Sequence, residues 1–379
     1  MEQIGSSQKN STRAIFFING FAAASWAPLV PVLRERLYIE EDLLGMLLLC
    51  VGIGSLFTMP LAGNLASKFG CRKVLTAVSI LAAVILLILC KVPNFGLAVV
   101  AVLLFGAIMG CTDVVMNIQA VIVEKAVKHQ IMSGMHAMYS VGGFVGAGLF
   151  GVWVGILKLS PFQSTLISAV IILLILLKFA KKFISSGGEK GGKLIALPKG
   201  ILIFIGLVAM ISYLVEGAVM DWSGVFLTIT KGFDISVAGV GFAMFSAAML
   251  LMRFVGDSLV EKLGKRFVIL VGCAVAFVGF LFIIFSASQI LLFAGFFLIG
   301  IGCANVVPIF FSMLGNQKIM PLNMAVPAVS TLGYLGILMG PAVIGFIAKA
   351  TSLYFAFGLL AVLIVIELVI ANYVCRKMS

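Results

Sequence analysis

Charged residues are scarce in this chain. Only 11% of its 379 residues are Asp, Glu, Lys or Arg, whereas 62% are hydrophobic. Soluble globular domains carry about a quarter of their residues as charges. The composition therefore argues against a soluble enzyme and for a protein whose main solvent is lipid.

Motifs for disulfides, metals and nucleotides are also missing. The seven cysteines lie in or at the ends of hydrophobic segments, and no two of them form a CxxC pair. We therefore expect neither a disulfide framework nor a zinc site. No GxxxxGK[ST] phosphate loop occurs, which argues against direct use of ATP. We expect no cofactor, no metal and no enzyme activity.

Long hydrophobic runs fill almost the whole chain instead. The first four are Ala14–Leu33, Leu43–Ala62, Val74–Cys90 and Leu97–Ile118, and the last is Tyr354–Val374. A run of about 20 apolar residues spans the hydrocarbon core of a bilayer. The pattern predicts an all-α membrane protein with about twelve transmembrane helices.

The net charge of +12 is explained by topology rather than by a nucleic-acid partner. If the N-terminus is cytoplasmic and the spans alternate, 20 of the 26 Lys and Arg residues lie on the cytoplasmic side. Such an excess follows the positive-inside rule. An even number of spans then places both termini in the cytoplasm, and we expect a multi-pass protein of the inner (cell) membrane.

The two halves of the chain resemble each other. GCTDVV at 110–115 recurs as GCANVV at 302–307, and the polar stretch 181–200 lies between the halves. This stretch is rich in Gly, Ser and Lys, and such composition is typical of a flexible linker. We predict an N-terminal six-helix bundle (1–180), a cytoplasmic linker (181–200) and a C-terminal six-helix bundle (201–379). Repeated halves with a site near the bilayer midplane are a transporter architecture.

Several stretches resemble a known family. The loops GNLASKFGCRK (63–73) and DSLVEKLGKR (257–266) resemble the signature loop of the major facilitator superfamily. The segments FFINGFAAASWAPLVPVL (16–33), MHAMYSVGGFVGAG (135–148), EGAVMDWSGVFL (216–227) and STLGYLGILMGPAVIGF (330–346) are similar to its fucose-permease-like branch, and most of all to the YbjJ-type bacterial members. The resemblance covers the whole chain and implies two pseudo-symmetric six-helix bundles that work by alternating access.

The first signature loop departs from the family pattern. The family usually has an acid where this chain has Ser67, and Glu261 supplies that acid in the second half. The resemblance implies that Glu261 and the loop residue Arg72 take part in gating. Arg253 and Asp257 are four residues apart near the cytoplasmic end of their helix, and we interpret them as a gate latch. The alternative is an ordinary salt bridge at a helix end.

Four acids fall within the predicted spans, namely Asp113, Glu216, Asp221 and Glu367. Ionisable residues at bilayer depth are expensive and mark proton or substrate pathways. We expect no Lys or Arg at mid-span to neutralise them. The resemblance implies that the helices of Asp113 and Glu216 line the cavity, so these two are our proton-coupling candidates. The alternative is that they only fix helix packing.

A second set of residues offers hydrogen bonds and flat rings to a solute. Asn117 follows Asp113 by one helical turn on the same face. Asn305 matches Asp113 in the repeat and precedes Pro308, which is expected to kink its helix. The predicted substrate-binding residues are Asn19, Trp26, Asn117, Tyr139, Tyr213 and Asn305. The alternative for each is ordinary packing in the membrane.

These features predict a secondary active transporter that moves a small polar solute, sugar-like or a related metabolite, by alternating access with proton symport. An exporter of amphipathic compounds by proton antiport is one alternative. A receptor or scaffold without transport is another, although the loops are short. The expected partners are the solute, a proton and the lipid bilayer, with no nucleic acid, and we expect a monomer.

Overall fold

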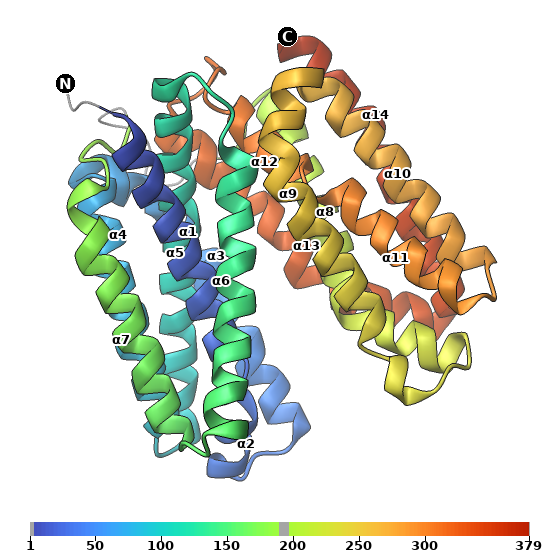
Figure 1. Ribbon diagram of the computed structural model, residues 1–379, viewed down its shortest axis with the longest axis horizontal. Helices are drawn as coiled ribbons and strands as arrows, with labels where there is room; N and C mark the ends of the chain where they lie inside the picture. The colour runs from blue at the N-terminus through green and yellow to red at the C-terminus, as the bar shows by residue number, and fades with distance from the viewer. Residues whose placement is uncertain (1–3, 189–196, 379) are drawn as a thin grey trace. The chain divides into compact units, whose positions relative to one another are not determined.

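The computed structural model describes residues 4–188 and 197–378, and these residues are helical apart from short turns. They form two compact units (Figure 1). Unit 1 falls within Met1–Lys128, Met135–Ala196 and Met320–Pro327, and unit 2 within His129–Gly134, Leu197–Ile319 and Ala328–Ser379. The units therefore follow the two sequence halves except at residues 129–134 and 320–327.

The first half of the chain contains seven α-helices and two short irregular helices. In order these are α1 (Ser6–Trp26), α2 (Leu29–Leu37), α3 (Glu41–Phe69), α4 (Cys71–Lys91), α5 (Phe95–Val127), α6 (Met132–Gly151), η1 (Val152–Ile156), α7 (Pro161–Phe179) and η2 (Ala180–Lys182). In unit 1, α5 packs along α3, α4 and α1, and α7 packs against α4 and α1.

The second half also contains seven α-helices and two short irregular helices. Its helices are α8 (Ile201–Val225), η3 (Phe226–Thr230), η4 (Ile235–Val237), α9 (Val240–Leu263), α10 (Lys265–Phe285), α11 (Gln289–Cys303), α12 (Val306–Met313), α13 (Leu322–Ala350) and α14 (Leu353–Met378). In unit 2, α11 packs on α10 and α9, and α14 packs on α10 and α8.

The membrane-spanning prediction is confirmed. Within the described residues, twelve helical segments are long and apolar enough to cross a bilayer. The first of them, Ser6–Leu37, includes both α1 and α2. Pro28 lies between these two helices, where the missing N–H and the fixed φ of proline interrupt regular helical bonding.

The repeat seen in the sequence is reproduced in the backbone. Gly70 ends α3 and starts α4, and Gly264 ends α9 and starts α10. Both glycines have a φ of +82°, and their ψ values are 151° and 150°. A side chain is strongly disfavoured at such a φ, so the two signature loops need glycine at these positions for the same reason.

Close helix contacts hold unit 1 together. A Cβ atom added at Gly142 of α6 would lie 2.2 Å from the backbone oxygen of Phe17 of α1. Gly146 also faces α1, near Phe21. Their missing side chains let two helices of one unit approach closely.

We expect the substitution Gly142→Ala to lower the free energy of unfolding by about 1 to 3 kcal/mol, because the new methyl group forces α1 and α6 apart. The measurement is the thermal unfolding midpoint of the purified protein in detergent. Gly148→Ala is the matched control on the same helix, because a Cβ there meets nothing within 4 Å. Equal stability of the two variants would contradict the close contact.

Candidate functional site

In unit 1 the polar residues of α5 meet inside the bundle. Asp113 is half-buried and Asn117 is fully buried, one turn further along the helix. The amide nitrogen of Asn117 donates to the backbone oxygen of Asp113 at 2.9 Å and lies 3.5 Å from its carboxylate Oδ1. The i to i+4 relation read from the sequence is therefore a real contact, and Asn117 orients the carboxyl group of Asp113.

The other candidates of unit 1 lie on α1 and α6. Asn19 is buried in α1, beside Gly20, which packs against the backbone of Tyr139. Tyr139 itself is half-buried. The ring of Trp26 lies 5.4 Å from that of Phe105 of α5, which gives this side chain a packing role in the bundle.

In unit 2 the candidate residues lie around a break in one membrane-spanning helix. The span Gln289–Met313 is interrupted between α11 and α12, at Ala304 and Asn305. The cause is Pro308, because it has no N–H to donate to the carbonyl of Ala304, four residues earlier. That carbonyl accepts instead from Nε of Arg253 at 3.2 Å. The kink expected from the sequence is present, and it anchors a buried arginine.

Arg253 in turn reaches the acid of α8. One guanidinium nitrogen lies 4.0 Å from Oε2 of Glu216, with side chains 8% and 33% exposed, respectively. The expectation that no cation lies at mid-span is therefore wrong. Arg253 is ten residues from the end of α9 at Leu263, which is about 15 Å along a helix. A count from the helix end, with Gly264 marking the end, could have placed it there.

The three predicted substrate-binding asparagines share a feature that is rare in buried polar side chains. The side-chain oxygens of Asn19, Asn117 and Asn305 are buried and have no hydrogen-bond partner among the described residues. Asn305 uses its nitrogen, which donates to the backbone oxygen of Met252 at 3.2 Å. Buried polar atoms in native proteins are almost always paired, so each exception calls for a reason. A hydrogen-bond donor on a solute or a water would satisfy each of these oxygens separately.

The predicted gating residues of unit 2 hold the start of α6. Asp257 accepts from the backbone N–H groups of Ser133 and Gly134, both at 2.9 Å. Glu261 accepts from the N–H of Gln130 at 3.1 Å and lies 3.3 Å from Nδ1 of His129. Negative charge at a helix N-terminus is stabilised by the unpaired N–H groups and the helix dipole. Both acids therefore contact residues at or just before the first turn of α6.

The segment that follows η2 is buried and hydrogen-bonded at its start, whereas its composition predicts a flexible linker. We call Phe183–Gly188 the strap. Phe183 and Ile184 are 0% and 1% exposed. The gating candidate Arg72 donates from Nε to the oxygen of Phe183 at 2.8 Å and from its backbone N–H to the oxygen of Ile184 at 2.9 Å. The rest of the predicted linker includes residues 189–196, which lie outside the described residues.

Gln119 of α5 ties the strap to the bundle. Its Oε1 accepts from the N–H of Ile184 at 3.2 Å, and its Nε2 donates to the hydroxyl of Thr12 at 3.0 Å. The residue is fully buried. Sequence reasoning did not single it out, although a glutamine in a membrane-spanning helix commonly hydrogen-bonds to neighbouring segments.

We expect Gln119→Leu to lower the free energy of unfolding by about 1 to 3 kcal/mol, because two buried bonds are lost and their partners stay behind. Trypsin should then cut faster at Lys181 and Lys182, next to the strap. Ser79→Ala is the control, since the buried hydroxyl of Ser79 has no partner in the described part of the chain. An unchanged cleavage rate at both lysines would contradict the role given to Gln119.

Glu367 and Asp221, the other two acids within the spans, have different surroundings from Asp113 and Glu216. Glu367 of α14 is buried and accepts a short hydrogen bond from the hydroxyl of Ser212 on α8. This contact joins two helices of unit 2. Asp221 is exposed near the end of α8.

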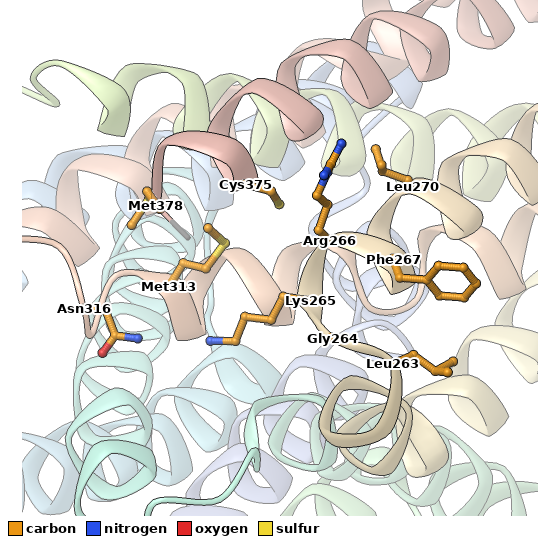
Figure 2. Close-up of a pocket in the computed structure, with 10 residues that line it drawn as sticks. All are labelled: Leu263, Gly264, Lys265, Arg266, Phe267, Leu270, Met313, Asn316, Cys375 and Met378. Atoms are coloured by element: carbon orange, nitrogen blue, oxygen red, sulfur yellow. The ribbon is translucent and has the colours of Figure 1, made fainter.

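Unit 2 also contains a cavity of about 500 Å³ where α9 meets α10 (Figure 2). Lys265, Arg266 and Asn316 supply its polar lining, and Met313, Cys375 and Met378 are on the side of α12 and α14. In Figure 2 the side chain of Lys265 extends toward Met313 and Asn316, and Arg266 lies beside Cys375. None of the predicted coupling or substrate residues lines it.

Comparisons with known proteins agree with the fold. An uncharacterised MFS-type transporter of Yersinia pestis is 44% identical over 99% of this chain and 97% of its own length. The membrane protein MosC of Rhizobium meliloti is 30% identical over 89% of this chain and 83% of its own length. Both relatives therefore match nearly end to end.

Solved structures are similar in fold at low identity. The fucose:proton symporter FucP of E. coli superposes with a TM-score of 0.78 and 15% identity, over 97% of this chain and 98% of FucP. The human organic anion transporter MFSD10 gives a TM-score of 0.75 and 16% identity, over 96% of this chain and 99% of its own. The family profile described as Major Facilitator Superfamily matches residues 14–317. This chain belongs to the major facilitator superfamily and is a multi-pass membrane transporter, not an enzyme.

Proposed function

We propose that this transporter moves a small polar solute, sugar-like or a related metabolite, across the inner membrane together with a proton. It works by alternating access, as a monomer with both termini in the cytoplasm. The observation that carries the proposal is that each unit has buried amide oxygens without a partner among the described residues, those of Asn19 and Asn117 in unit 1 and that of Asn305 in unit 2. Acceptors of this kind suit a solute rich in hydroxyl groups, because each hydroxyl donates one hydrogen bond.

The proton-coupling role rests on two carboxyl groups within the spans. Asp113 is half-buried in unit 1 and is oriented by Asn117. Glu216 is a third exposed in unit 2 and lies beside Arg253. An acid that is partly accessible at bilayer depth can exchange a proton with water and still lie in a low-dielectric site. Tyr139 and Tyr213 are half-buried, and we include them as candidate aromatic contacts for the solute.

Gating is proposed for Arg72, Arg253, Asp257 and Glu261. The support is that the two acids bind backbone N–H groups at the start of α6, while Arg72 binds backbone oxygens of the strap. Hydrogen bonds with one charged partner are strong, yet they are made and remade without covalent change. Such contacts suit a conformational latch.

The similar solved structures leave the solute class open. One transports fucose with protons and the other is an organic anion transporter, and a likeness at 15% or 16% identity concerns the fold alone. We therefore derive the solute class from the unpaired amide oxygens and the aromatic rings of this chain.

The test uses the purified protein in liposomes that enclose a pH-sensitive dye. A panel of sugars, organic acids and nucleosides is added outside, one compound at a time. Symport predicts that at least one neutral polar compound acidifies the lumen. Alkalinisation by amphipathic compounds would point to antiport and export instead. Binding of a panel compound without any flux would favour a receptor and would refute the transport proposal.

A further inference from the structure

We propose that the cavity shown in Figure 2 binds the phosphate headgroup of an anionic phospholipid from the surrounding membrane. The cavity lies between the turn that joins α9 to α10, the end of α12 and the last turns of α14. Its volume of about 500 Å³ is in the range of small-molecule sites, which run from about 300 to 1,000 Å³. This site is separate from the proposed solute residues and does not depend on the transport proposal.

The lining residues favour an anion. Lys265 and Arg266 both contribute to the cavity, and none of the described residues that line it is acidic. Nζ of Lys265 donates to the hydroxyl of Ser312 at 2.7 Å, and Nε of Arg266 donates to Oδ1 of Asn372 at 3.0 Å. Both acceptors are neutral, and the two bonds orient the cationic side chains. The guanidinium and ammonium groups are the usual partners of phosphate oxygens.

The position of the cavity along the helices favours a lipid over a soluble phosphate. The membrane-spanning segment of α9 ends at Leu263, that of α10 begins at Lys265, and that of α14 ends at Met378. The cavity is therefore at the depth where the spans leave the hydrocarbon and phospholipid headgroups lie.

Apolar side chains border the cations. Leu263 and Phe267 line the same cavity, and they are 50% and 52% exposed. Exposed side chains of this kind suit the acyl chains of a lipid whose phosphate meets Lys265 and Arg266. A soluble phosphate ion would gain nothing from them. The joint presence of two cations and an exposed apolar border is the chemical signature of an anionic lipid site.

The experiment measures binding of dihexanoyl phosphatidylglycerol to the full-length protein in neutral detergent, by native mass spectrometry. Dihexanoyl phosphatidylcholine and inorganic phosphate are the comparison ligands. We expect Lys265→Gln/Arg266→Gln to bind the phosphatidylglycerol about thirtyfold more weakly, because each basic residue near an anionic lipid contributes roughly a factor of five. The double variant Lys181→Gln/Lys182→Gln removes the same charge from exposed positions in unit 1 and should bind as the wild type does.

Two further measurements test whether the positive charge, rather than apolar contact, binds the lipid. The charge-retaining variant Lys265→Arg/Arg266→Lys should keep most of the binding, and higher salt should weaken phosphatidylglycerol binding to the wild type. Equal binding of the phosphatidylcholine would overturn the proposal, because apolar contact alone would then explain it. Displacement of the lipid by inorganic phosphate at the same concentration would also overturn it, in favour of a soluble ligand.

Discussion

Asp113→Asn should abolish uphill accumulation of the solute while leaving its binding intact. The substitution keeps the size of the side chain and one acceptor oxygen, and the bond from Asn117 to the backbone oxygen of residue 113 does not depend on the carboxyl group. It removes the only group of this pair that can carry a proton. A protein without that group can still equilibrate its solute, but it cannot couple the movement to the proton gradient.

The expected size of this effect follows from the membrane potential. One charge that crosses 100 mV supplies about 2.3 kcal/mol, which sustains roughly 40-fold accumulation. In liposomes with an imposed proton gradient, the ratio of inside to outside concentration of the most active compound of the panel should fall from roughly 40 to about one. Counterflow exchange, which needs no gradient, should persist.

Glu367→Gln is the matched control for this experiment. Glu367 is another carboxyl group within a span, and its contact with Ser212 joins α14 to α8 within unit 2. We expect this variant to lose stability and to keep its accumulation ratio once it is reconstituted. If Asp113→Asn accumulates solute as the wild type does, Asp113 is not the coupling residue.

The fold could be predicted from the sequence because its strongest signals are repetitive. Apolar runs of span length follow one another along the chain, and a bilayer permits only helices for such runs. The signature loops are equally predictable, since Gly70 and Gly264 need the same positive φ at equivalent positions. The pairing of Asn117 with Asp113 needed only the helical period.

Contacts between helices that are distant in the sequence could not be predicted from these repetitive signals. The pair of Glu216 and Arg253 joins α8 to α9, and it depends on the break at Pro308 that frees the carbonyl of Ala304. The strap is a second case. Its composition of Gly and Ser is typical of flexible linkers, yet Gln119 and Arg72 supply hydrogen bonds that hold its backbone. Composition describes a segment alone, whereas these partners lie elsewhere in the chain.

The ion pair of unit 2 makes the second large prediction. Glu216→Gln leaves the guanidinium of Arg253 buried without that carboxylate, and Arg253→Gln leaves a carboxylate that is a third exposed. Removal of one partner of a buried pair costs about 3 to 5 kcal/mol, and the cost falls when the remaining charge reaches water. We therefore expect Glu216→Gln to be the more destabilising single variant, by about 3 kcal/mol, and Arg253→Gln to cost less.

The double variant Glu216→Gln/Arg253→Gln separates stability from transport. It buries neither charge, so its thermal unfolding midpoint should recover most of the loss caused by Glu216→Gln, and the coupling energy follows from the double-mutant cycle. Flux should stay abolished in all three variants, because a structural role alone would let the double variant transport again. Recovery of both stability and flux would reduce the pair to packing, whereas recovery of stability alone would assign Glu216 and Arg253 to the transport cycle.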